Sequence, residues 1–238
     1  MITEMEMGKV DQRNYIYNQL RRQILNMDIL PGEKLSENTL ASQMNASRPM
    51  VRDALSRLVE EGYIVVYPQR GTEVTLLDSE RIRQAVFSYT VLEQAMIEEI
   101  CRRGLTKHQI SQLEAVLEDQ KSEAGKGNLI DFLIVEQSLH YLLSTFCGRE
   151  YVWEVYRTLD CDLLRLNYLQ YTTFNYKTDM SSLTSQEHVQ VEGRLLLDNL
   201  RRRDADAACL ICVNHFNTVL WNAGTLREIY PQFFSGQA

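Results

Sequence analysis

Residues 47–55 of the chain run Ser-Arg-Pro-Met-Val-Arg-Asp-Ala-Leu and carry the most information about the fold. Proline is tolerated in the first turn of a helix, so the stretch predicts a helix that begins at its N-terminal end. Arg48 and Arg52 are four residues apart and share one face of that helix, whereas Val51 and Leu55 begin an apolar stripe on another face. We therefore expect one face to be buried while two guanidinium groups point outward.

Two outward arginines have a plain interpretation and a functional one. On most exposed helices such a pair is only a solvated surface. Arginine also donates two hydrogen bonds to O6 and N7 of guanine in the major groove, and recognition helices do this with their N-terminal residues. The elements on either side of the helix decide between the two interpretations.

The segments around this helix follow the order helix, helix, helix, hairpin. Apolar residues recur close to a helical period over 13–27, and a second, shorter helix is expected over 36–44. Aromatic and β-branched residues fill 63–67 and 72–76, with a Pro-Gln-Arg-Gly turn between them. This order predicts a winged helix-turn-helix, in which Arg70 at the tip of the wing could lie beside the minor groove.

The rest of the chain is predicted to be helical. Helices are expected over 79–103, 106–123, 128–147, 150–171, 186–203 and 204–223. Residues 172–185 are polar and show no clear pattern. Helices in this number can enclose an interior, so the sequence predicts a mainly α protein: a winged helix-turn-helix DNA-binding domain at 1–76 and an all-helical bundle at 77–238.

The acidic charge of the chain is uneven. The 238 residues carry a formal charge of −7, of which −1 falls in residues 1–76 and −6 in residues 77–238. Non-specific affinity for nucleic acid should therefore be weak, so any DNA binding must depend on a few directed contacts. No apolar run approaches the ~18–20 residues of a membrane span, and residues 1–11 do not resemble a secretory signal. The five cysteines are an odd number, and we expect free thiols and a cytoplasmic location.

The first region resembles the GntR family of bacterial transcription regulators. The matching motifs are Tyr17-x2-Leu20-Arg21-x2-Ile24, Leu30-Pro31-Gly32-Glu33-Lys34-Leu35-Ser36-Glu37, Leu40-Ala41, Met44, Ser47-Arg48, Val51-Arg52-x-Ala54-Leu55, Leu58, Glu61-Gly62 and Arg70-Gly71. Together they cover residues 14–76 almost continuously. The helical remainder resembles the FCD-type effector domain of the family's FadR subgroup.

The resemblance implies a homodimer that binds double-stranded DNA at a pseudo-palindromic operator, with a small-molecule effector in the C-terminal bundle that alters the affinity for DNA. The residues that it places toward DNA are Ser47, Arg48, Met50 and Arg52 on the recognition helix, Arg70 and Gly71 in the wing, and Asn38 on the preceding helix. Many members carry an arginine where this chain has Asn38, so the operator sequence is not expected to transfer. Repression and activation both stay open.

Metal-binding members of the FCD group use an Asp and a His four residues apart on one helix, with two further histidines from later helices. Here Glu136 and His140 form the first pair and His215 fits the last position, but Gly193 stands where the middle histidine belongs. Such ligands suit Zn, Ni or Mn. Three interpretations stay open: a metal held by Glu136, His140 and His215, a metal-free pocket that binds an organic effector directly, or groups with no ligand role.

Two further residues are candidates for effector binding. Tyr89, four residues before Glu93, stands where members of the family often carry an arginine. Arg165 lies among apolar neighbours and, if buried, could anchor an effector carboxylate; an ion pair inside the bundle or a surface charge is the alternative. The resemblance favours a small organic acid as the effector. Cys209 and Cys212 have the spacing of a redox pair, but they fall within an apolar helix and are expected to be structural thiols.

Two functions of other classes compete with a regulator. A metal-dependent enzyme could use Glu136, His140 and His215 as an open site, but no general base or nucleophile beside them can be named, and the arginine pair would have no role. Alternatively, the winged domain could contact a partner protein instead of DNA. The salt dependence of binding distinguishes DNA from a protein partner. DNA binding weakens steeply as the salt concentration rises, whereas binding through an apolar protein interface weakens much less. We expect a regulator and not an enzyme.

Overall fold

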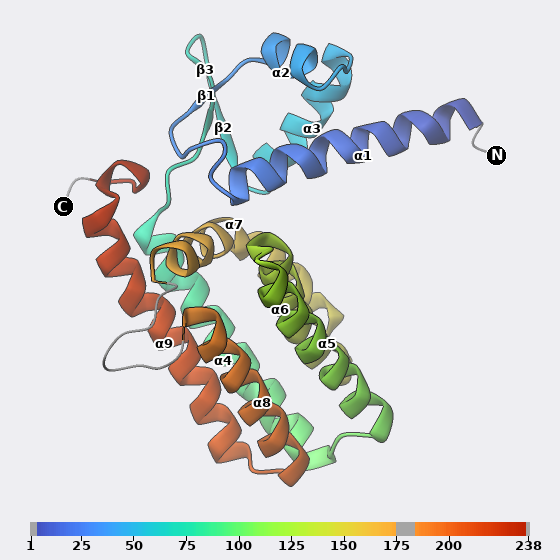
Figure 1. Ribbon diagram of the computed structural model, residues 1–238, viewed down its shortest axis with the longest axis vertical. Helices are drawn as coiled ribbons and strands as arrows, with labels where there is room; N and C mark the ends of the chain where they lie inside the picture. The colour runs from blue at the N-terminus through green and yellow to red at the C-terminus, as the bar shows by residue number, and fades with distance from the viewer. Residues whose placement is uncertain (1–3, 175–183, 237–238) are drawn as a thin grey trace. The chain divides into compact units, whose positions relative to one another are not determined.

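The computed structural model describes residues 4–174 and 184–236, with side chains from residue 12 onward. Residues 175–183 include most of the stretch to which the sequence assigns no element, and they lie outside the described part. The described chain is mainly helical (Figure 1) and forms two compact units. One unit contains the chain up to Asp78 and the segment after Ile229, and the other is Ser79–Ile229.

The first unit is a three-helix domain with a small antiparallel sheet. Its helices are α1 (Glu4–Leu25), α2 (Glu37–Gln43) and α3 (Arg48–Glu60), and its strands are β1 (Lys34–Leu35), β2 (Ile64–Tyr67) and β3 (Gly71–Val74). The strand order is β1-β3-β2, with β2 and β3 forming the hairpin that the sequence predicts. The sequence analysis missed β1, because two residues are too few to show the alternation typical of a strand.

The core of the first unit lies between α1 and α3. Leu20 and Ile24 of α1 and Val51 and Leu58 of α3 are completely buried. At roughly 1.5–3 kcal/mol for each fully buried aliphatic side chain, this contact holds α3 firmly on one face and leaves the opposite face to solvent. The two helices therefore fix which residues of α3 point outward.

The C-terminal segment belongs to the first unit, although the sequence analysis assigned all of 77–238 to the bundle. Leu77 donates its backbone N–H to the carbonyl of Phe233 at 2.9 Å, and Ser235 donates to the carbonyl of Leu77 at 2.8 Å. The intervening side chain of Phe234 is buried. Main-chain pairing of so few residues leaves no periodic signal in a sequence. A short 3₁₀ helix, Pro231–Phe233, leads into this pairing.

The second unit is a bundle of six helices within the described residues. They are α4 (Ser79–Arg103), α5 (Lys107–Lys126), α6 (Leu129–Phe146), α7 (Glu150–Thr173), α8 (Ser185–Arg202) and α9 (Ala205–Ile229). In Figure 1, α9 lies along α4 and α8, while α5 and α6 form a second pair of neighbours. No described helix is long and apolar enough to cross a membrane.

Helix boundaries in the second unit follow the predicted caps. Thr106 and Gln109 form a capping box at the start of α5, and Asn128 accepts a hydrogen bond from the Asp131 backbone at the start of α6. Gly127 closes α5 with a φ of 70°, the left-handed conformation that glycine adopts most readily. The predicted starts of the six helices agree with the structure within a residue or two, the amount by which helix ends normally vary. Two predicted ends fall short, because α5 continues to Lys126, three residues past 123, and α9 to Ile229, six residues past 223.

Candidate DNA-binding surface and effector pocket

Helix α3 has one buried face and one exposed face, as its sequence predicts. Val51, Leu55 and Leu58 are buried against the rest of the first unit, whereas Arg48 and Arg52 are exposed. Arg48 makes no hydrogen bond or ion pair with any described residue. An unpaired guanidinium at the start of a solvent-facing helix is available to a phosphate or a guanine.

Arg52, in contrast, is already engaged. Its Nε and Nη2 atoms donate to the two carboxylate oxygens of Glu37 at 3.0 and 2.8 Å, a bidentate ion pair that joins α3 to α2. The hydrogen bond from Arg52 lowers the pKa of Glu37, and the nearby charge of Arg48 lowers it further. The sequence analysis missed Glu37, because the pairing is between two helices and follows no spacing rule.

The start of α3 has unused hydrogen-bonding capacity. Ser47 occupies the N-cap position in an extended conformation, but its side chain makes no capping hydrogen bond. Ser47 therefore holds the N-cap position without capping the helix through its hydroxyl. Pro49 has no backbone N–H, and that of Met50 donates to the Ser47 carbonyl at 3.1 Å. The Ser47 hydroxyl and the exposed Arg48 guanidinium are therefore the side-chain donors that this end presents to a phosphate.

The other predicted DNA-facing residues also belong to the first unit. Asn38 is exposed on α2, and Met50 is half-buried on α3. Arg70 is exposed in the hairpin, with its guanidinium carbon 5.4 Å from the centre of the Tyr67 ring. Gly71 follows with a φ of 101°, a left-handed conformation that a residue with a side chain adopts only with strain.

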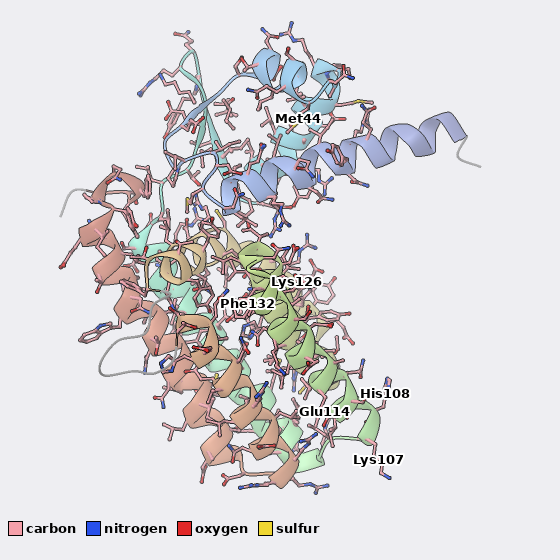
Figure 2. The ribbon with its side chains drawn as sticks, viewed as in Figure 1. Met44, Lys107, His108, Glu114, Lys126 and Phe132 are labelled. Carbon is pink, nitrogen blue, oxygen red and sulfur yellow. The ribbon has the colours of Figure 1, made fainter. Side chains whose placement is uncertain are left out.

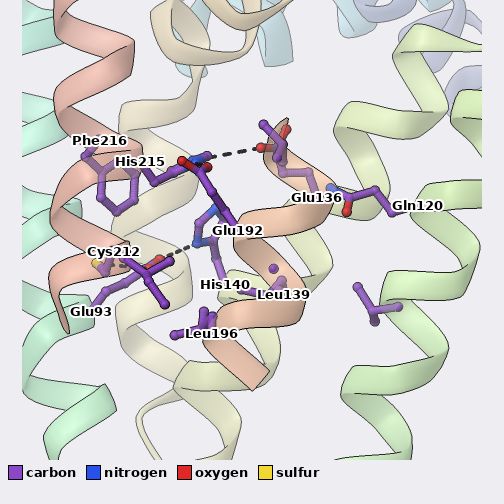
Figure 3. A pocket seen from close by; sticks show the side chains of 14 residues that line it. Glu93, Gln120, Glu136, Leu139, His140, Glu192, Leu196, Cys212, His215 and Phe216 are labelled. Atoms are coloured by element: carbon purple, nitrogen blue, oxygen red, sulfur yellow. Dashed lines mark hydrogen bonds and ion pairs between the residues drawn. The ribbon is translucent and has the colours of Figure 1, made fainter. Parts of the chain in front are cut away.

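The second unit contains a pocket lined by α4, α5, α6, α8 and α9. Figure 3 shows the polar side chains that meet there. Five of them can carry charge: Glu93 from α4, Glu136 and His140 from α6, Glu192 from α8 and His215 from α9. The structure thus brings together Glu136, His140 and His215, as the resemblance implied. It adds Glu93 and Glu192, which the sequence analysis did not propose as ligands.

Each histidine of the pocket is paired with one of these added glutamates. His140 Nδ1 is hydrogen-bonded to Glu93, and His215 Nδ1 is 2.9 Å from the Glu192 carboxylate. His215 Nε2 lies 3.8 Å from Glu136. The two rings are 6.4 Å apart between centroids. The pocket therefore holds a network of three carboxylates and two imidazoles.

Burial and pairing act in opposite directions on these groups. Burial raises the pKa of Glu136, and the two histidines offset this only in part. Burial alone would lower the pKa of His140, but the charge of Glu93 and the hydrogen bond to it raise that pKa above its ordinary value. Burial likewise opposes the charged form of His215, yet the hydrogen bond and charge of Glu192 raise its pKa to about 9. The His215 ring therefore favours the imidazolium form at neutral pH, and the pKa of His140 shifts in the same direction.

A resident metal does not fit this arrangement. No group of three or more His, Cys, Asp or Glu side chains is placed to hold a metal ion in the described part of the chain. Hydrogen bonds between Nδ1 and a glutamate orient each ring and would leave Nε2 for a metal, so they do not themselves exclude one. Gly193, however, contributes no ligand at the position of the missing histidine. A Cβ atom built on Gly193 would lie 2.6 Å from Leu117 Cδ2, so a larger residue there requires Leu117 to move.

Tyr89 and Arg165, the two other residues predicted to bind an effector, are not among the residues that line the pocket, and their part in effector binding stays a prediction. The hydroxyl of Tyr89 donates to Asp160, and its ring stacks on Tyr156 at 3.7 Å. Arg165 is completely buried and forms an ion pair with Asp162 at 2.7 Å. The alternative considered for Arg165, an ion pair inside the bundle, is the arrangement that the structure shows.

The remaining histidines take no part in the pocket. His108 projects from the start of α5 into solvent, beside Lys107 (Figure 2). His188 is exposed on α8. His188 lies five residues before Gly193, the position of the missing histidine, and does not line the pocket.

The cysteines are free thiols, and Cys209 and Cys212 form no disulfide. The Cys212 thiol is buried and 3.8 Å from a Glu93 oxygen, and burial raises its pKa. Cys209 is only partly buried, and burial together with the charge of Glu98 raises its pKa to about 11. These contacts describe structural thiols, as the sequence predicts.

We expect Cys209 to react slowly with alkylating agents. With a pKa about three units above pH 8, only about a thousandth of the thiol is the reactive thiolate. Its alkylation by iodoacetamide, followed by mass spectrometry, should lag far behind that of a peptide thiol at pH 8 and accelerate up to about pH 11. A rate at pH 8 equal to that of the peptide would show that Cys209 is an activated thiol.

The fold and these two sites define a class of protein: a DNA-binding winged-helix domain joined to a helical ligand-binding domain. The family model described as bacterial regulatory proteins, gntR family, matches residues 12–74, and the FCD domain model matches residues 87–218. The chain belongs to the GntR family and carries an FCD domain. It is a transcriptional regulator.

Relatives agree over nearly the whole chain. The HTH-type transcriptional repressor RspR of Escherichia coli is 28% identical over 92% of each chain. An HTH-type transcriptional regulator of Streptomyces ambofaciens is 30% identical over 97% of this chain and 92% of its own. A GntR regulator from Rhodococcus has the same fold, with a TM-score of 0.71, 17% identity, and coverage of 90% of this chain and 98% of its own.

Proposed function

We propose that this regulator acts in the cytoplasm as a homodimer of the FadR subgroup. The first domain binds a pseudo-palindromic operator with the start of α3 in the major groove and the β2–β3 wing beside it. The second domain carries the dimer contact and an effector pocket. Because the E. coli relative is named a transcriptional repressor, repression is the proposed direction.

One observation carries the DNA-binding part of this proposal. Arg48 is exposed and unpaired in the described chain, at the start of a helix whose other face is fixed in a core. Ser47 beside it leaves its hydroxyl free. A cation and a hydroxyl on one rigid helix end match the phosphates and base edges of a major groove.

The chain connectivity offers a route by which the pocket could affect DNA binding. α4 carries Glu93 and begins directly after Asp78, and α9 carries His215 and ends directly before Tyr230. Leu77 and Phe233, just beyond these junctions, are hydrogen-bonded to each other within the first unit. An effector that binds one arrangement of α4 and α9 more tightly thereby favours one arrangement of the paired DNA-binding domains.

The test is a binding titration with the full chain. A duplex selected from a random pool should bind with an affinity that falls steeply with salt, because each phosphate contact releases counterions. The complex should contain two chains by light scattering. Affinity that is insensitive to salt favours the rival function, in which the winged domain contacts a protein. The alternative function, a metal-dependent enzyme, has less support. No residue beside the charged groups of the pocket is assigned as a nucleophile, and an enzyme would leave Arg48 without a role.

We further propose that the pocket binds its effector directly, without a metal. Calorimetric titration of chelator-treated protein with Zn²⁺ or Ni²⁺ should show no binding tighter than about 10 µM, because no three ligand side chains are placed to hold one ion in the described chain. Stoichiometric, tighter binding that is lost in His215→Ala would restore the metal hypothesis.

A further inference from the structure

The effector pocket holds one more acidic group than basic groups. Glu93 is paired with His140, and Glu192 is paired with His215, so each imidazole already has its own carboxylate. Glu136 is the third carboxylate, and it faces a His215 nitrogen 3.8 Å away whose ring is already shared with Glu192. Even with both rings protonated, an ionised Glu136 leaves the network one positive charge short. The pKa of Glu136 is raised because burial is only partly offset by the two histidines, and a cation beside it would favour the carboxylate.

No lysine or arginine lines this pocket among the described residues. An organic acid would therefore bring a fourth carboxylate into a buried network that already has an uncompensated one, at a high electrostatic cost. A protonated amine supplies the missing charge instead. Its N–H groups can also donate charge-assisted hydrogen bonds to the glutamate oxygens.

A second observation comes from α5. Gln120 lines the same pocket and is only 4% exposed, and its Oε1 atom has no hydrogen-bond partner within the described chain. Figure 3 shows this side chain reaching from α5 toward Glu136. A buried amide oxygen without a partner is rare in folded proteins. A ligand N–H donor placed here would satisfy Gln120 and would lie beside the surplus carboxylate.

The rest of the pocket lining is apolar, so the remainder of the ligand is expected to be an apolar group. Val116, Leu139, Ile211 and Phe216 contribute hydrocarbon surface, and the ring of Phe216 can attract a cation through its face. We propose that the pocket binds an organic cation: a small protonated amine attached to an apolar group. This inference rests on the proposed function, since it names the chemical class of the effector.

Matched pairs of amines and acids test the charge requirement directly. Isobutylamine and cyclohexylamine carry the same alkyl groups as isovalerate and cyclohexanecarboxylate but the opposite charge. At millimolar concentration and neutral pH, we expect at least one amine to raise the melting temperature of the full chain, because a ligand bound only by the native state stabilises it. Neither acid should do so. Stabilisation by the acids alone, or by none of the four compounds, would overturn the proposal.

The Glu136→Gln variant locates the effect. It keeps an oxygen to accept the Tyr171 hydroxyl, which lies 3.1 Å from Glu136, and it removes the surplus charge. Amine affinity, measured by calorimetry, should fall by roughly 10- to 100-fold, the effect of losing a hydrogen bond to a charged group. Glu118→Gln, an exposed change on α5, is the matched control and should bind like the parent. Full amine affinity in Glu136→Gln would contradict the proposed site.

Gln120→Leu provides an independent variant with the same net charge. It should weaken amine binding by a few fold to about tenfold, because the amide oxygen loses its role as acceptor. Unchanged amine affinity would contradict the role of Gln120. All of these measurements are made without DNA. A negative result would therefore contradict the proposal of an amine effector without bearing on operator binding. Failure of operator binding by the unliganded protein would instead contradict the proposed function.

Discussion

Replacing Arg48 with alanine is expected to weaken operator binding by roughly 30-fold or more. A bidentate contact between arginine and guanine contributes about 1–3 kcal/mol, and the proposed homodimer would lose two such contacts. The change should leave the fold intact, because Arg48 is exposed and has no partner within the described residues. Fluorescence anisotropy with a labelled operator gives the two affinities directly.

Two comparisons separate a specific contact from a general loss of charge. Arg157→Ala removes the same charge from an exposed position on α7 and should change affinity little. Arg52→Ala should weaken binding less than Arg48→Ala, because the Arg52 guanidinium must first leave Glu37, 2.8 Å away. If Arg48→Ala bound as tightly as the parent, the assignment of α3 as the recognition helix would be wrong.

Replacing Arg165 with methionine is expected to destabilise the protein by about 3–5 kcal/mol, the cost of breaking a buried ion pair by removing one partner. Arg165 is completely buried and pairs with Asp162, whose side chain is 2% exposed. Arg81 also contacts Asp162, at 3.3 Å, but is itself 45% exposed and replaces little of the lost interaction. Calorimetry should record a fall in melting temperature of roughly 6–20 °C.

The same helix supplies a matched control. Arg157 and Glu154 form an ion pair with the same three-residue spacing, at 3.4 Å, but both side chains are more than half exposed. Arg157→Met should therefore cost no more than about 1 kcal/mol. A similar small cost for Arg165→Met would show that the buried pair contributes nothing to stability, and the alternative role of Arg165 as an effector anchor would return.

The DNA-binding region was more predictable than the pocket because its signals are local. The stripe of Val51, Leu55 and Leu58 and the position of Gly71 follow from helical periodicity and turn chemistry along one stretch of chain. The pairing of Arg52 with Glu37 was missed because it joins two helices. The two-residue strand β1 and the pairing of Leu77 with Phe233 were missed for a related reason, since neither leaves a repeating pattern.

The pocket depends on residues from helices that are far apart in the sequence. The resemblance predicted that Glu136, His140 and His215 share one site. Only the structure shows Glu93 and Glu192, which are hydrogen-bonded to the Nδ1 atoms of the two histidines. A sequence shows which side chains can carry charge, but it does not show which of them meet in one cavity or what net charge they give it. The pocket contains three carboxylates and two imidazoles. This excess of acidic groups is the reason that the proposed ligand is an amine and not an organic acid.

The most direct test of directed DNA binding is to sequence the duplexes that the full chain retains from a random pool, in parallel with Arg48→Ala. We expect the parent to enrich a two-fold symmetric motif whose half-sites lie about one helical turn apart or closer. The variant should lose the motif, or lose its preference at one position of each half-site. An identical motif for both proteins, or no motif for the parent, would contradict the account.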